Sequence, residues 1–193
     1  ALGFDDKTGV TDGQGPLATA PLDQFATIVA NVVFQHGFSW DSACELTDEF
    51  MVNEMTAGPR PEELIPRGHI KQSLSRLYDA GFTLTVATTD NRLATQSALD
   101  ALRIDHFFSD IRCGDDVGPV KPDVAVLESI ATGQRCRIDQ IVMVGDTVSD
   151  LMMAKNAGAK CCVGILGGAG SADQLLGFAD FLIEDIGEIQ PDF

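Results

Sequence analysis

Two carboxylates follow a short apolar run in the last third of the sequence. Asp146 and Asp150 come after residues 141–144, Ile-Val-Met-Val, and lie four positions apart. That spacing is about one helical turn, so both carboxylates can face one site from the end of a strand and the start of a helix. Paired carboxylates with few basic groups nearby suit a hard cation bound through oxygen. We therefore predict that Asp146 and Asp150 hold Mg²⁺.

Hydroxyl groups and one lysine complete a set that can handle phosphate. Thr88 and Thr89 follow the apolar run 82–87, and the N–H groups of the helix expected after them can donate to a phosphate oxygen. Lys121 stands just before Pro122, where its charge can neutralise a phosphoryl group and the carboxylates. Phosphoryl transfer depends mainly on positioning and charge neutralisation. We predict Thr88, Lys121 and Asp146 as catalytic groups, and Thr88, Thr89 and Lys121 as substrate-binding groups.

Each of these residues, taken alone, also fits a purely structural place. Asp150 suits the first turn of a helix, Asp146 suits a turn, and Lys121 suits a surface. Their order along the chain favours a shared function, because each follows or adjoins a strand-like segment. Ligands of open parallel sheets bind at the carboxyl ends of the strands, where these residues would meet.

The hydrophobic pattern around these groups predicts strands alternating with helices. Strands are expected at 82–87, near Ile111, at 141–144, at 161–165 and, as an edge strand, at 181–183. Helices are expected at 70–80, at 94–102, from a first turn at Pro122 to a stop at Gly133, at 151–157 and at 171–179. Such alternation predicts a three-layer α/β/α, Rossmann-like core with a parallel sheet over residues 59–193.

The N-terminal part of the chain has a different character. The first twenty residues are rich in Gly, Asp, Thr and Pro and indicate loop. Two helices are expected after them, at 21–35 and, capped by Ser39, at about 39–55. A proline-rich linker at 56–66 then separates residues 1–58, which we predict to be a partial helical cap, from the core.

Composition limits the partners. With 193 residues, 45% of them hydrophobic, the chain can form a globular core. A net charge of -16 disfavours nucleic acid and anionic membranes as partners, and no apolar run reaches membrane-spanning length. The five cysteines are odd in number and form no CxxC pair, which indicates free thiols in a reducing compartment. We expect a cytoplasmic protein whose partner is a small phosphorylated metabolite; the sequence sets no oligomeric state.

The same segments resemble, in order, three motifs of the haloacid dehalogenase-like hydrolases. Leu84-Thr85-Val86-Ala87-Thr88-Thr89 resembles the second motif and Val120-Lys121-Pro122 the third. The GDxxxD form of the fourth motif is similar to residues 142–150, and residues 154–159 continue it as in phosphoglycolate phosphatase-like members. The resemblance covers about residues 59–189.

This resemblance implies a Mg²⁺-dependent phosphatase that hydrolyses a small phosphomonoester through an aspartyl-phosphate intermediate. It implies that Thr88 binds a phosphoryl oxygen and that Lys121 steadies the nucleophile and the phosphate. It also implies that Asp146 holds Mg²⁺ most directly, together with Asp150. In this family the substrate is chosen by residues of the cap, so the motifs do not name it.

The first motif of the family, DxDGT/V, is where the sequence departs. The local candidate is Phe4-Asp5-Asp6-Lys7-Thr8-Gly9-Val10, and read from Asp5 it has Lys7 in place of the second aspartate. Read from Asp6, the segment resembles the DKTGT of P-type ATPases. In those ATPases DKTGT is accompanied by a GDGxND form, which this chain lacks at its fourth motif. We favour the interpretation that this chain lacks the first motif, is poorly active and has a gap in its sheet that favours association. The alternatives are a nucleophile at Asp5 or Asp6, an ATPase fragment, and a non-catalytic protein that binds phosphate or a partner.

Overall fold

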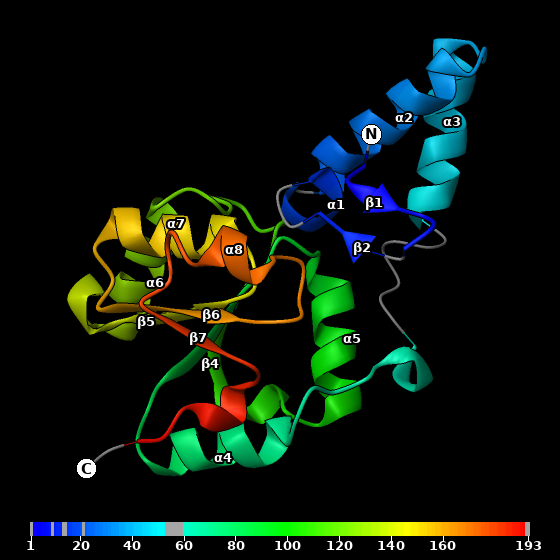
Figure 1. The fold of residues 1–193 in the computed structure, drawn as a ribbon. Helices are drawn as coiled ribbons and strands as arrows, with labels where there is room; N and C mark the ends of the chain where they lie inside the picture. The colour runs from blue at the N-terminus through cyan, green and yellow to red at the C-terminus, as the bar shows by residue number, and fades with distance from the viewer. Residues whose placement is uncertain (1, 9, 13–14, 21, 53–59, 192–193) are drawn as a thin grey trace.

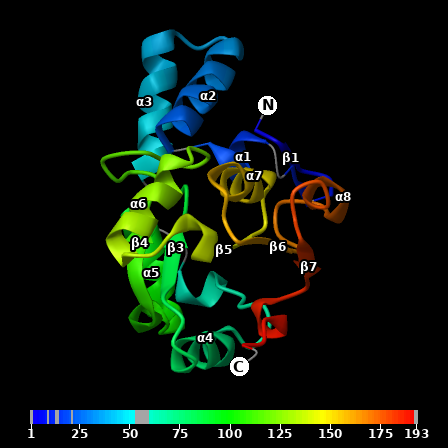
Figure 2. The same ribbon diagram turned by 90° about the vertical axis from the view of Figure 1, so that its left-hand side faces the viewer.

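The chain folds into an α/β core and a helical hairpin that stands away from it. The computed structural model describes residues 2–8, 10–12, 15–20, 22–52 and 60–191. Figure 1 shows the hairpin of α2 (Leu22–Gln35) and α3 (Trp40–Phe50) projecting from the core, and the view from the side in Figure 2 shows the same separation. Among the described residues, no helix is both long and apolar enough to cross a membrane.

The N-terminal part contains the two helices that the sequence predicts. Its elements are β1 (Phe4–Asp5), β2 (Val10–Thr11), α1 (Pro16–Thr19), α2 (Leu22–Gln35) and α3 (Trp40–Phe50). Ser39 caps α3 as expected, because its hydroxyl accepts the N–H of Ser42 at 3.2 Å. The α-helix covers Trp40–Phe50 and continues as a π-turn through Met51 and Val52, whereas the predicted end near 55 and the first part of the predicted linker lie outside the described residues. The division into residues 1–58 and 59–193 stays a prediction.

The core alternates helices and strands as predicted. Its elements are α4 (Ile70–Asp79), β3 (Leu84–Ala87), α5 (Arg92–Leu102), β4 (Phe108–Arg112), α6 (Ala125–Gln134), β5 (Val142–Gly145), α7 (Val148–Ala157), β6 (Cys161–Ile165), α8 (Ala172–Leu175) and β7 (Phe181–Ile183). Four short 3₁₀ turns, at Pro61–Glu63, Asp105–Phe107, Ile138–Gln140 and Ile186–Glu188, lie around them. These elements and their parallel pairing confirm an α/β fold.

Both ends of the helix predicted from Pro122 to Gly133 were wrong. Pro122 lies in a turn before α6 rather than in its first turn: its bond to Lys121 is cis, and Val120 accepts the N–H of Asp123 at 3.0 Å. The same helix passes through Gly133 and ends at Gln134, where Arg135 takes the left-handed conformation with φ 55°.

The helix predicted at 171–179 was also wrong in length. It stops at Leu175, and the N–H of Phe178 donates to the carbonyl of Leu175, three residues back, at 2.9 Å instead of following the four-residue pattern of an α-helix. Apolar spacing locates a helix, but such local hydrogen bonds decide where it ends.

The parallel strands form two separate parts instead of one continuous sheet. Strand β3 pairs with β4, while β5 pairs with β6 and β6 with β7. In Figure 2, β3 and β5 lie between β4 on one side and β6 on the other. Within the described part of the chain they pair with their outer neighbours and not with each other. This break agrees with the gap that we expected in the sheet.

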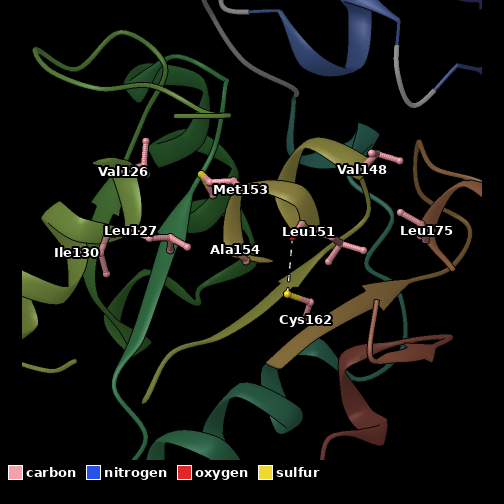
Figure 3. Close-up of a cluster of buried hydrophobic side chains, with 9 residues drawn as sticks. All are labelled: Val126, Leu127, Ile130, Val148, Leu151, Met153, Ala154, Cys162 and Leu175. Atoms are coloured by element: carbon pink, nitrogen blue, oxygen red, sulfur yellow. Dashed lines mark hydrogen bonds between the residues drawn. The ribbon is translucent and has the colours of Figure 1, made fainter. Parts of the chain in front are cut away.

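The larger hydrophobic cluster anchors α7, the helix that begins at the predicted site. Leu151, Met153 and Ala154 of α7 are fully buried and pack with side chains of α6, β6 and α8 (Figure 3). Burial of each large side chain stabilises the fold by roughly 1.5–3 kcal/mol. The start of α7 is therefore held on a rigid support. A second cluster, Leu74, Leu99, Ile104 and Phe107, joins α4 and α5 to β3 and β4.

Candidate functional site

The turn between β5 and α7 holds the residues of the predicted fourth motif. Thr147 caps α7: its hydroxyl oxygen accepts the N–H of Asp150 at 3.1 Å and donates its own proton to Oδ2 of Asp150 at 2.8 Å. Both side chains are buried. The cap therefore fixes the helix start and the carboxylate of Asp150 together.

A buried ion pair joins the third and fourth motifs. The Nζ of Lys121 donates to Oδ1 of Asp150 at 2.7 Å, and only 12% of the lysine side chain and 5% of the aspartate side chain are exposed. With Oδ2 bonded to Thr147, both carboxylate oxygens of Asp150 are engaged. Gly145 leaves room for the side chain of Asp150, since a Cβ at position 145 would lie 2.6 Å from the Cβ of Asp150. Asp150 thus holds Lys121 in place in this arrangement.

Asp146 is held differently, by the loop that follows β6. Its Oδ2 accepts the N–H of Ala169 at 2.9 Å, and its carbonyl oxygen accepts the N–H of Gly170 at 2.8 Å. Its Oδ1 has no hydrogen-bond partner among the described residues. A half-buried carboxylate with one oxygen fixed and one open can bind a cation.

The donor set fits a magnesium ion that keeps much of its water. No group of three or more His, Cys, Asp and Glu side chains in the described part of the chain could hold a metal on its own. Mg²⁺ nevertheless binds proteins through one or two carboxylates, with water and substrate oxygens as the other ligands. The open Oδ1 of Asp146 suits that mode. Asp150 could bind the ion only with an oxygen that already accepts a hydrogen bond from Lys121 or Thr147.

The threonines of the second motif end β3 in the other part of the sheet. The N–H of Thr88 donates to the carbonyl of Arg112 at 2.9 Å, and its hydroxyl oxygen accepts the N–H of Asp90 at 3.1 Å. The hydroxyl proton of Thr88 stays available to an anion. No hydrogen bond between described residues joins Thr88 or Thr89 to Lys121, Asp146 or Asp150. The structure thus brings the lysine and Asp150 into contact, with Asp146 at the same turn, and leaves the threonines on a separate edge.

Asp5 and Asp6 lie on an exposed hairpin. Strand β1, Phe4–Asp5, pairs antiparallel with β2 and forms a two-stranded sheet of its own. The N–H of Lys7 donates to Oδ1 of Asp5 at 2.9 Å and holds the pKa of that carboxyl below its usual value. No described hydrogen bond or ion pair links either aspartate to Lys121 or Asp146. A role for Asp5 or Asp6 as nucleophile stays untested.

Two features of the site were missed by the sequence analysis. One is Arg92, whose guanidinium binds Asp116 at 2.6 Å and the carbonyl of Ile111 at 2.8 Å, and so ties the start of α5 to the loop after β4. Nothing in the sequence marks that pairing. The other is the loop 167–170, Gly-Gly-Ala-Gly, which contacts Asp146. Its position directly after an apolar strand was the available signal.

Comparison with known proteins gives consistent matches. The profile of the family described as haloacid dehalogenase-like hydrolase matches residues 23–163. The chain is 33% identical over 148 residues to the phosphoglycolate phosphatase of Vibrio cholerae, which covers 76% of this chain and 63% of that protein. It is 32% identical over 131 residues to the pyrophosphatase PpaX of Halalkalibacterium halodurans, with 61% of each covered. The chain thus spans less than two thirds of the length of these relatives.

Among solved structures, a predicted phosphoglycolate phosphatase from Haemophilus somnus superposes with a TM-score of 0.63 at 24% identity. The superposition covers 77% of this chain and 64% of that one. At this level of identity the likeness concerns the fold, and it agrees with the α/β architecture described above.

Proposed function

The chain belongs to the haloacid dehalogenase-like hydrolase family, and on that premise we propose that it is a Mg²⁺-dependent phosphatase acting on a small phosphomonoester. The names of its relatives, phosphoglycolate phosphatase and pyrophosphatase, support a small phosphorylated substrate. The proposed reaction proceeds through an aspartyl-phosphate intermediate, as the family resemblance implies.

The buried pair of Lys121 and Asp150 carries this proposal. The ammonium group of Lys121, whose side chain is only 12% exposed, is held by the carboxylate of Asp150, which Thr147 fixes in turn. Burial of a lysine ammonium costs free energy unless an oppositely charged or hydrogen-bonding partner compensates for the lost water. One of its three N–H bonds goes to Asp150, so the others can donate to the oxygens of a phosphoryl group.

The other residues have roles that follow from their contacts. Asp146 would hold Mg²⁺ with its open Oδ1, and the ion would neutralise charge on the phosphoryl oxygens. Thr88 donates its hydroxyl proton to a phosphoryl oxygen from the neighbouring sheet edge. Asp150 orients Lys121 and stands close enough to Asp146 in sequence to bind the cation through water. These groups bind and neutralise a phosphoryl group without attacking it.

A nucleophile is the part that the described site does not supply. Attack by the hydroxyl of Thr88 would require an adjacent base, and its only described side-chain bond is to the N–H of Asp90. This observation favours a second candidate function: non-catalytic binding of phosphate or a partner. It also leads us to expect poor turnover by the chain as written.

An assay of four proteins separates the candidates. p-Nitrophenyl phosphate and phosphoglycolate are offered at millimolar Mg²⁺ to this chain, to its Asp5→Asn and Asp6→Asn variants, and to a form extended by the residues encoded upstream of Ala1. Turnover only by the extended form supports the phosphatase with a nucleophile outside the described site. Turnover by this chain that Asp5→Asn or Asp6→Asn abolishes assigns that aspartate as nucleophile. Tungstate binding without turnover by any form establishes the non-catalytic candidate.

A further inference from the structure

We propose that the loop 167–170 is a clamp, a segment whose hydrogen bonds hold the Asp146 carboxylate in position for the cation. Gly168 sets how closely the loop approaches that carboxylate. The inference rests on the proposed function, because it assigns Mg²⁺ to Asp146. It adds positioning residues that lie outside the family motifs and about twenty residues downstream of the carboxylate they act on.

Two hydrogen bonds fix Asp146 at both its main chain and its side chain. The N–H of Gly170 donates to the carbonyl oxygen of Asp146 at 2.8 Å, and the N–H of Ala169 donates to Oδ2 at 2.9 Å. A hydrogen bond to a charged oxygen is about twice as strong as one between neutral groups. With the backbone and one oxygen held, rotation of the carboxylate is restricted and Oδ1 keeps one direction.

Steric contacts show why this loop is rich in glycine. A Cβ at position 168 would overlap Oδ2 of Asp146 and lie 2.5 Å from its Cβ. A Cβ at position 170 would lie 2.6 Å from the carbonyl oxygen of Asp146. The φ angles of Gly168 and Gly170 are outside the left-handed region, so close approach, and not backbone conformation, excludes a side chain.

The loop is packed on its other side as well. The guanidinium of Arg67 lies against Gly167, where a Cβ would come within 2.8 Å of its Cζ. A loop confined between Arg67 and Asp146 has little room to relax. An added methyl group at position 168 must therefore move the carboxylate, and displacement of a group that orients a metal ligand typically weakens metal binding about 10–100-fold.

Gly168→Ala tests the clamp, with Gly177→Ala as the matched control. Position 177 has a φ outside the left-handed region and no atom within 4 Å of an added Cβ, so the same change is harmless there. Mg²⁺ is titrated calorimetrically into the chain and both variants, and tungstate is titrated without Mg²⁺. We expect Gly168→Ala to raise the Mg²⁺ dissociation constant about tenfold, to leave tungstate binding through Lys121 unchanged, and Gly177→Ala to match the parent.

Two further measurements separate a positioning role from general damage. In the Asp146→Asn background, Gly168→Ala should have no further effect on Mg²⁺ affinity, because the ligand it positions is gone. Hydrogen exchange at the Ala169 amide should be faster in Gly168→Ala than in Gly177→Ala, whether or not metal is present. If Gly168→Ala does not fold, Ala169→Pro, which removes the donor to Oδ2, replaces it in the same titrations.

The outcomes distinguish this inference from the function on which it rests. Equal Mg²⁺ affinity and equal Ala169 exchange in the parent and Gly168→Ala would overturn the clamp. Equal Mg²⁺ affinity in the parent and Asp146→Asn would instead overturn the assignment of the cation to Asp146. Parallel losses of Mg²⁺ and tungstate binding in Gly168→Ala would show general damage and also overturn the clamp.

Discussion

Removal of the Lys121 ammonium should destabilise the fold strongly and weaken anion binding at the same time. Lys121→Ala leaves Asp150 with a side chain only 5% exposed and without its cationic partner. Breaking a buried ion pair by deleting one member typically costs about 3–5 kcal/mol, because the remaining charge is desolvated and uncompensated. Asp150 keeps its hydrogen bond from Thr147 at 2.8 Å, so we expect about 3 kcal/mol.

Urea denaturation at pH 7 measures this loss in the free energy of unfolding. For a protein of this size, 1 kcal/mol corresponds to a shift of about 2–4 °C in Tm, so the Tm of Lys121→Ala should lie roughly 6–12 °C below that of the parent. The pair of Arg137 and Asp139 is the internal control, because its side chains are 77% and 56% exposed. Arg137→Ala should leave the free energy of unfolding nearly unchanged, because an exposed ion pair contributes little to stability.

A double-mutant cycle separates the ion pair from the packing of the lysine stem. Lys121→Met keeps an apolar stem of similar length, and Asp150→Asn removes the charge that Lys121→Met leaves unpaired. The two changes together should destabilise by at least about 1.5 kcal/mol less than the sum of the single changes. A coupling energy below about 0.5 kcal/mol would refute the ion pair as the organising contact of the site. Unchanged tungstate binding by Lys121→Met would refute its role in anion binding.

Three further predictions test the surroundings of the site by urea denaturation. Thr147→Val removes the cap of α7 and the bond to Asp150, and should cost about 1–2 kcal/mol. The Arg92 guanidinium holds the pKa of Asp116 below its usual value despite burial. The pair therefore stabilises the fold fully above the unfolded pKa of the aspartate, near 3.8, and this contribution is lost as the pH falls through the folded pKa. Asp116→Asn should therefore cost about 0.5 kcal/mol at pH 7 and less at pH 3, given a partly exposed pair. Gly133 is exposed within α6, and no atom lies closer than 3.8 Å to a Cβ added there. Gly133→Ala should therefore stabilise the fold by about 0.5–1 kcal/mol. An unchanged free energy of unfolding would show that the helix is strained at this position.

The elements of the core were predictable because their signals are local. The stripe Leu74 and Leu77 in α4 and the apolar strands β5 and β6 follow directly from hydrophobic spacing. The order of the candidate residues at strand ends was equally visible. Helix ends were not, because they depend on particular hydrogen bonds, such as those that turn the chain back to Leu175 after α8.

The partners of the candidate side chains were predictable only in part. The sequence analysis placed the charge of Lys121 near the carboxylates, and Lys121 does bind Asp150, but spacing alone did not predict the loop that holds Asp146, 23 residues further along. The spacing of Asp146 and Asp150 predicted that both carboxylates face one cation, and the family resemblance implied that Asp146 holds it most directly. The structure gives the two carboxylates different neighbours: Lys121 and Thr147 engage Asp150, while the loop after β6 holds Asp146. A spacing of one turn brings two side chains to one end of a helix, but it does not decide what else packs there.

A hydrogen bond at the start of β5 indicates which of its peptide groups face the break in the sheet. The carbonyl of Ile141 accepts the N–H of Lys160 at 2.8 Å, so Ile141 faces the β6 side. Because peptide groups alternate between the two edges of a parallel strand, Met143 faces β6 as well, and Val142 and Val144 face the open edge. Val142 is 45% exposed, unusual for a valine in a parallel strand.

This assignment predicts that proline at two adjacent positions of β5 destabilises the fold to different extents. Val142→Pro removes an N–H that faces the open edge, whereas Met143→Pro removes one that bonds to β6, and a proline is tolerated in a strand only where no ladder bond is lost. Urea denaturation should show a loss at least about 1 kcal/mol larger for Met143→Pro. An open edge also favours association between copies, so sedimentation should show the self-association of the chain weakened by Val142→Pro. Equal destabilisation by the two prolines would mean that the β5 edge is already paired, and the separation of the sheet into two parts would then be wrong.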